Sequence, residues 1–171
     1  MMTSLHSPTH WRLMGEDDLA SVSAIAKDVH PDFPEDDAVF LNRLALHAKG
    51  AYVLEVENSV VGYAITHPWK NFDIPALNTV LAALPQQSGT YYIHDIALLD
   101  TARGTGAAGR IVSILARHAM ELGFKTLSLV AVNGSSGFWQ KQGFEIIEQP
   151  NLEPKLKTYS DDACFMLRQL G

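Results

Sequence analysis

The stretch that decides the fold is YYIHDIALLDTARGTGAAG, residues 91–109, in which an apolar strand-like run leads into a glycine-rich loop. Residues 104–109 spell G-x-G-x-x-G, the pattern of a dinucleotide-binding turn. That turn requires its first glycine at the end of the strand and an acidic residue after the second strand. Here residues 100–103 separate the strand from Gly104, and the second strand ends in Val132-Asn133-Gly134 without an acid. The pattern therefore argues against a nicotinamide-dependent oxidoreductase.

The same loop fits a second pattern, Arg103-x-x-Gly106-x-Ala108, placed between a strand and a long amphipathic helix. Glycine and alanine let the backbone approach a pyrophosphate closely, and the free amides at a helix N-terminus favour its negative charge. The guanidinium of Arg103 adds a fork of hydrogen-bond donors. This arrangement predicts a loop that binds phosphate groups.

The pattern resembles the acyl-coenzyme A site of the GNAT superfamily of N-acetyltransferases, which reads roughly Gln/Arg-x-x-Gly-x-Gly/Ala. The stretch SSGFWQKQGFEII, residues 135–147, is similar to a later segment of that superfamily, where an aromatic residue and Gly-Phe precede the sixth strand. The resemblance extends over residues 11–167. It implies an N-acetyltransferase that moves an acetyl group from acetyl-coenzyme A to a primary amine by direct attack.

Periodicity and breaker residues predict an α/β (α+β) fold: a mixed, mostly antiparallel sheet of about six to seven strands flanked by helices. The resemblance adds a V-shaped splay between the fourth and fifth strands. Residues 68–89 are predicted to form an excursion from the sheet that contains a small helix. The proline-containing stretch before the last strand is predicted to be a polar loop. The expected strands are 10–14, 51–56, 60–67, 91–99, 126–132, 144–147 and 163–167, and the expected helices are about 16–29, 35–50, 107–122 and 137–142.

The composition fits one globular domain, residues 1–171 with a core at about 10–168, because 47% of the residues are hydrophobic. The net charge of -6 disfavours nucleic acid as a partner, and no apolar run is long enough to cross a bilayer. Residues 1–10 carry no basic start or apolar run, and the lone Cys164 excludes an internal disulfide. We therefore expect a cytoplasmic protein without a membrane partner. Monomer and homodimer both remain open.

The resemblance implies that acetyl-coenzyme A lies in the splay, with backbone groups of Ile96, Ala97 and Leu98 aligning the pantetheine arm. Asn133 is interpreted either as a turn residue or as a contact to pantetheine or acceptor. Trp139 stands where relatives often hold a tyrosine acid, and an indole cannot donate a proton at ordinary pH, so we expect it to pack against the cofactor. The other expected cofactor-binding residues are Arg103, Gly104, Thr105, Gly106, Ala107, Ala108, Gly109, Ser136, Phe138 and Lys141.

His94 and Asp95 are polar residues inside an apolar strand, where they need partners or a cleft. Many relatives hold a glutamate at the position of His94 that takes a proton from the amine, which makes His94 the first candidate for the general base. Asp95 and Tyr92 are the alternatives, beside a purely structural histidine. Strand alternation places Tyr92 and His94 on one face and Asp95 on the other, so both polar residues reach one pocket only through a bulge.

Other titratable residues carry weaker signals. The acids of residues 32–37 are interpreted as a solvated loop and helix start, with amine binding as the alternative. The seven histidines show no metal-ligand spacing, so no metal is assigned. The acceptor is expected to be a small-molecule or peptide amine, and a non-catalytic acyl-coenzyme A sensor is the alternative function.

Overall fold

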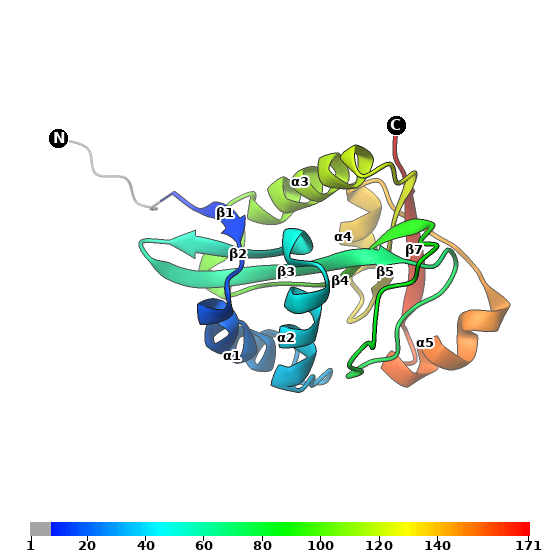
Figure 1. Ribbon diagram of the computed structural model, residues 1–171, viewed down its shortest axis with the longest axis horizontal. Helices are drawn as coiled ribbons and strands as arrows, with labels where there is room; N and C mark the ends of the chain where they lie inside the picture. The colour runs from blue at the N-terminus through cyan, green and yellow to red at the C-terminus, as the bar shows by residue number, and fades with distance from the viewer. Residues whose placement is uncertain (1–7) are drawn as a thin grey trace.

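Strand β4 (Thr90–Leu98) lies at the centre of the structure, a computed structural model that describes residues 8–171 (Figure 1). It pairs with β3 in antiparallel and with β5 in parallel orientation, in a seven-stranded sheet of order β1-β2-β3-β4-β5-β7-β6. The remaining strands are β1 (His10–Leu13), β2 (Ala51–Val56), β3 (Ser59–Trp69), β5 (Thr126–Ala131), β6 (Glu145–Ile146) and β7 (Cys164–Gln169). This is the mixed, mostly antiparallel sheet that the sequence predicts.

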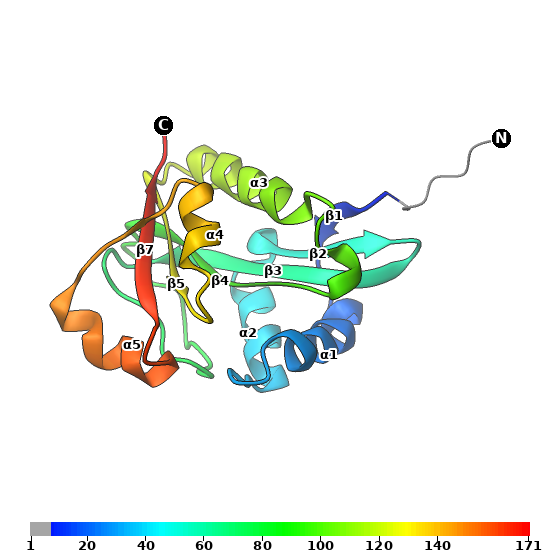
Figure 2. The same ribbon diagram turned by 180° about the vertical axis from the view of Figure 1, so that it is seen from behind.

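Helices cover both faces of the sheet (Figures 1 and 2). One face carries α3 (Ala107–Glu121) and α4 (Ser136–Lys141), and the other carries α1 (Leu19–Val29), α2 (Asp37–Leu46) and α5 (Glu153–Tyr159). The apolar stripe of α3 packs against the sheet through Ile111, Leu115 and Ala119, spaced four residues apart on one side of the helix. Short 3-10 turns occur at residues 16–18, 48–50, 100–102 and 150–152.

The sheet splays open between β4 and β5. These strands pair only at Tyr91–Leu127, Tyr92–Ser128 and Ile93–Leu129. Beyond these pairs β4 continues to Leu98 without a partner on the β5 side, so a gap opens between the two strands. The predicted V-shaped splay is confirmed.

A β-bulge marks the start of this gap. Across β3 and β4, Ile65 pairs with Asp95 while the next residue, Thr66, pairs with Ile93, so that His94 is the extra residue. Because a bulge interrupts the alternation of side chains, His94 and Asp95 can reach the same side of the strand.

Two local predictions are wrong. Residues 70–89 contain no helix, and β3 extends to Trp69 before this segment begins. The stretch before the last strand is not only a loop, because residues 153–159 form α5. Pro154 is tolerated there in the first helical turn, where its missing amide has no partner to lose, and Leu156 is buried against β7. No helix in residues 8–171 has the length and apolar character needed to cross a membrane.

Candidate active site

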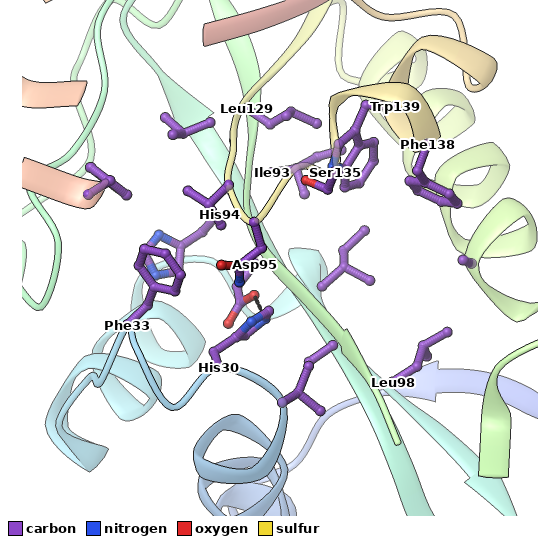
Figure 3. Close-up of a pocket in the computed structure, with 18 of the residues that line it drawn as sticks. His30, Phe33, Ile93, His94, Asp95, Leu98, Leu129, Ser135, Phe138 and Trp139 are labelled. Atoms are coloured by element: carbon purple, nitrogen blue, oxygen red, sulfur yellow. Dashed lines mark ion pairs between the residues drawn. The ribbon is translucent and has the colours of Figure 1, made fainter. Parts of the chain in front are cut away.

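A cavity of about 510 Å³ occupies the gap between β4 and β5 (Figure 3). At one end, the glycine-loop end, it is bounded by the start of α3, the outer part of β4 and α4. At the other, the histidine end, it is bounded by the C-terminal end of α1, the loop to α2, the bulge and α5. The glycine-loop end is lined by Ile96, Ala97, Leu98, Arg103, Gly104, Ala108, Asn133, Ser135, Phe138 and Trp139. The histidine end is lined by Val29, His30, Phe33, Glu35, Leu77, His94, Asp95, Val130 and Tyr159.

The glycine loop depends on backbone conformations that glycine adopts without strain. Gly104 has φ +78° and Gly106 has φ +83°, both in the left-handed region. Gly106 is the N-cap of α3, so the first amides of this helix follow it directly. A Cβ atom at Gly104 would meet no neighbour within 4 Å, which means that the requirement for glycine there is conformational. The loop therefore presents free helix amides beside the cavity.

His94 is held by a buried carboxylate. Its Nε2 lies 2.8 Å from Oε1 of Glu35, and the two side chains are only 3% and 6% exposed. A carboxylate only accepts hydrogen bonds, so Nε2 carries the proton, and in the neutral ring Nδ1 carries a lone pair. Nδ1 is buried without a hydrogen-bond partner. The other oxygen of Glu35, Oε2, accepts a hydrogen bond from the amide of Asn78 at 3.0 Å.

Burial acts to raise the pKa of Glu35. The positive charge that His94 carries when it is protonated, together with its hydrogen bond, outweighs burial and leaves the pKa lowered. Glu35 is thus ionised at neutral pH. The arrangement is a carboxylate that orients an imidazole whose second nitrogen is unpartnered.

Asp95, the residue after His94, forms a second carboxylate–histidine pair. Its Oδ1 lies 2.8 Å from Nε2 of His30 (Figure 3). Its Oδ2 accepts a hydrogen bond from the hydroxyl of Tyr63. Burial acts to raise the pKa of Asp95, but the hydrogen bond and charge of His30 and the Tyr63 hydroxyl lower it overall. For His30 burial acts to lower the pKa, yet the hydrogen bond and charge of Asp95 raise it on balance. Both oxygens of Asp95 are already engaged, and its basicity is reduced.

Tyr92 does not reach the cavity. Its ring is 1% exposed and packs with Trp69, Leu156 and Phe165 on the face that α5 covers. Burial raises its pKa well above the ordinary value. The structure therefore offers no route by which this phenol could serve as a general base. Tyr159 does line the cavity, but burial raises its pKa to about 12 and its hydroxyl donates a hydrogen bond to the carbonyl of Pro75 at 2.5 Å.

The structure brings most of the expected residues to one cavity. Both His94 and Asp95 line it, as do Asn133 and Trp139. Asn133 has φ +55° and is followed by Gly134 at φ +66°, the tight turn that leads into α4. Ser135 lines the cavity in place of the expected Ser136. Expected residues that do not line it are Thr105, Gly106, Ala107, Gly109, Ser136, Lys141 and Tyr92.

Several lining residues were not expected from the sequence. The interpretation of residues 32–37 as a solvated loop is wrong for Glu35, which is buried against His94. His30 and Phe33 line the cavity from the same loop, where Pro31 and Pro34 restrict the backbone. The one signal in the sequence for a buried Glu35 was its position between the prolines and an apolar helix, and an acid in this position is equally typical of an exposed helix start. Within residues 8–171, no three or more His, Cys, Asp or Glu side chains cluster in a way that could hold a metal ion.

Comparison with known proteins supports the assignment that this geometry suggests. The model of the acetyltransferase (GNAT) family matches residues 18–144. No curated protein sequence matches the chain.

Among solved structures, the chain is similar at low sequence identity to the three that follow. Ard1 from Thermoplasma volcanium is 19% identical, with 95% of this chain and 98% of that chain covered and a TM-score of 0.73. The GphF GNAT-like decarboxylase in complex with isobutyryl-CoA is 15% identical, with 95% and 100% covered and a TM-score of 0.79. Naa50 of Arabidopsis thaliana in complex with the bisubstrate analogue CoA-Ac-MVNAL is 15% identical, with 93% and 96% covered and a TM-score of 0.67.

These identities show a shared fold, while the family model covers most of the chain, including the splayed strands, the glycine loop and α4. On that evidence, the chain belongs to the GNAT family of acetyltransferases.

Proposed function

We propose that this protein is an N-acetyltransferase that moves the acetyl group of acetyl-coenzyme A to a primary amine by direct attack. The observation that carries the proposal is that one cavity joins the glycine loop to the His94–Glu35 pair. The cofactor and the amine would each find suitable chemistry at one end and meet in the middle, near the bulge.

The coenzyme would bind at the glycine-loop end. Free amides at the start of α3 favour the pyrophosphate, and Arg103 offers a further positive charge. Beyond Ile93, β4 has no partner on its β5 side, so the pantetheine arm can align with Ile96 to Leu98 as an added strand. A backbone amide of this segment would polarise the thioester carbonyl. Phe138 and Trp139 provide aromatic surface for the apolar part of the arm.

We assign the general base to Nδ1 of His94. A protonated amine has no lone pair, so one proton must leave before attack, and Nδ1 is the unpartnered acceptor at the histidine end. Glu35 would hold the ring in the required tautomer and stabilise the imidazolium that forms. The proton would pass from the amine to Nδ1 either directly or through one water molecule. Asp95 is the weaker candidate, because both oxygens are engaged and its pKa is lowered.

The covalent step balances without a redox cofactor. The amine nitrogen forms a bond to the carbonyl carbon and then loses its second proton to water, so that one proton is released overall. The tetrahedral intermediate collapses, and the carbon–sulfur bond breaks with the electron pair leaving on sulfur. The thiolate then takes a proton. Since Trp139 cannot donate one, the proton would come from water or from the His94 imidazolium.

The test is amine-dependent thiol release. Purified protein, acetyl-coenzyme A and a panel of primary amines are mixed, and free thiol and acetylated amine are both quantified. Release above the blank without amine, lost in His94→Ala, supports the proposal. Tight binding of acetyl-coenzyme A without any acetylated amine would instead identify a non-catalytic acyl-coenzyme A sensor.

A further inference from the structure

We infer that the acceptor is a small primary amine with an apolar body and no carboxylate near the amine, an inference that rests on the proposed function. It follows from the charges and the walls of the histidine end. Glu35 and Asp95 are both ionised there, and each already faces a histidine partner. Among the described residues, Arg103 is the only lysine or arginine that lines the cavity, and it belongs to the glycine-loop end.

An acceptor carboxylate would therefore be close to two ionised carboxylates. The histidines that face them, His94 and His30, are already engaged by those carboxylates, and no lysine or arginine of the described residues lines this end. Arg43, which lies in the neighbouring helix α2, does not line the cavity. Its side chain is buried, and its Nη1 donates hydrogen bonds to the side chain of Asn42 and the carbonyl of Thr79. Its Nε and Nη2 have no hydrogen-bond partner within residues 8–171, and its positive charge interacts with Glu35 from outside the cavity lining. Burying a charge without a partner is costly, so a free amino acid is a poor fit.

The rest of the histidine end is apolar. Its walls are formed by Val29, Phe33, Leu77, Val130 and the ring of Tyr159. A second ammonium group on a diamine would face these side chains, because the carboxylates that could receive it are already paired. An aromatic or branched alkyl body would instead bury apolar surface against them.

The segment of residues 70–89 borders this end through Leu77 and is held on both sides by hydrogen bonds. Tyr159 donates to the carbonyl of Pro75, and Lys155 donates to the carbonyl of Ile74 at 3.1 Å, which tie the segment to α5. On the other side, Oδ1 of Asn78 accepts from the amide of Asp36 at 2.7 Å, and the amide of Asn78 donates to Glu35. Figure 1 shows the segment between α2 and α5, bridging both flanks.

A polypeptide acceptor needs a groove that is open beyond the amine, so that the chain can continue outward. The bridge from α5 through residues 73–78 to the loop before α2, whose Leu77 lines the cavity, would block that direction. The closed end thus favours a compact acceptor over a peptide terminus.

The experiment compares acceptors that share one amine and one ring: 2-phenylethylamine, phenylalaninamide, phenylalanine and a phenylalanine-initiated tetrapeptide amide, with 1,5-diaminopentane as the dicationic arm. We expect 2-phenylethylamine and phenylalaninamide to have kcat/KM values within about tenfold of each other. Phenylalanine should fall about 100-fold below its amide when both kcat/KM values are expressed per unprotonated amine, because the carboxylate is then the main difference between them. The tetrapeptide and the diamine should also rank below 2-phenylethylamine.

A matched pair of variants tests the charge argument separately. Leu77→Arg adds a guanidinium to the apolar wall and should raise the ratio of kcat/KM for phenylalanine to that for phenylalaninamide about tenfold, whereas the uncharged Leu77→Gln should not. An unchanged ratio in Leu77→Arg would overturn the charge explanation. If phenylalanine, the diamine or the tetrapeptide is the best acceptor of the wild-type protein, the inference is wrong while the proposed function stands. If none of the five amines is acetylated, nor any amine of the wider panel, the proposed function itself fails.

Discussion

The two ends of the cavity are built on different principles. The glycine-loop end combines backbone and small residues with apolar and aromatic side chains, and its one arginine has a side chain that is 59% exposed. The histidine end holds an ion pair whose side chains are 3% and 6% exposed. A large anionic cofactor can be bound by many weak contacts at an open surface, whereas proton transfer gains from a site in which charges are poorly screened. The open end is suited to recognition and the closed end to chemistry.

The two ends also differ in how the chain assembles them. The glycine loop is one continuous stretch, residues 103–109, whose conformation is set locally by positive φ angles. The histidine end combines residues from α1, the loop before α2, the 70–89 segment, β4 and α5. Substitutions at the first end should therefore act on cofactor affinity alone, and substitutions at the second on turnover.

The largest expected effect is at the histidine end. His94→Ala should lower kcat/KM for the amine about 1,000-fold, because the group that takes the proton is lost. Glu35→Gln should lower it about 10- to 100-fold, since the ring would keep a hydrogen-bond partner but lose the adjacent charge. Neither variant should change the dissociation constant of acetyl-coenzyme A, measured by calorimetry.

His10→Ala is the control for these variants, because His10 is an exposed histidine outside the cavity. It should retain wild-type activity. A His94→Ala protein that is folded and nearly as active as wild type would shift the assignment to Asp95 or to a chain of water molecules.

The second effect is at the glycine-loop end. Gly106→Val places a β-branched residue at φ +83° and distorts the amides that start α3, so acetyl-coenzyme A should bind about 100-fold more weakly. Gly123→Val is the matched control: Gly123 has φ +90° in open space beyond the other end of the same helix. Both variants should lose roughly 1–2 kcal/mol of unfolding free energy. Equal cofactor affinity in the two proteins would contradict the role of the loop.

The sequence was sufficient to predict the fold and the glycine-loop end because their signals are local. Periodicity identified α3 and the central strands, and Gly104, Gly106 and Arg103 lie within a few residues of one another. The sequence predicted only that a bulge is required if His94 and Asp95 are to face one pocket. Strand alternation shows this requirement, but it does not show that the bulge forms.

The histidine end could not be predicted because its contacts are long-range. Glu35 and His94 are 59 positions apart, and His30 and Asp95 are separated by a similar distance. An acidic residue at a helix start is usually exposed, and only the tertiary fold buries Glu35. Helix α5 was missed for a local reason, since prolines flanking a polar stretch are more typical of a loop than of the first turn of a helix.

The third effect concerns the free energy of unfolding and involves His67, a buried histidine next to the histidine end. His67 is fully buried beside His94, with ring centroids 6.3 Å apart, and its Nδ1 donates to the carbonyl of Pro68. Burial lowers the pKa of His67 to about 3, and the charge of His94 acts in the same direction. In the unfolded chain a histidine titrates near 6.5, so between these values the unfolded state binds the proton and the folded state does not. Stability must therefore fall as the pH falls below about 6.5.

Between pH 6.5 and pH 5 this one group should cost about 2 kcal/mol of unfolding free energy. The measurement is urea unfolding of wild type and His67→Asn at pH 7 and pH 5. The asparagine amide can still donate to the Pro68 carbonyl but does not titrate, so the variant should lose about 2 kcal/mol less than wild type over this range. Identical losses in both proteins would show that His67 is accessible to protons in the folded state.

The smallest expected effect returns to the open end. Nη1 of Arg103 lies 3.3 Å from Oδ1 of Asp100, and both side chains are exposed, so solvent screens their interaction. Arg103→Ala should weaken acetyl-coenzyme A binding only about threefold at low salt, and this difference should shrink as ionic strength rises. Asp100→Asn should act in the opposite direction, because it frees the guanidinium for the cofactor and removes a negative charge near its phosphates. A large loss in Arg103→Ala that persists at high salt would mean that the arginine becomes buried against the cofactor. The contrast between an open recognition end and a more buried chemical end would then be weaker than the exposure of Arg103 indicates.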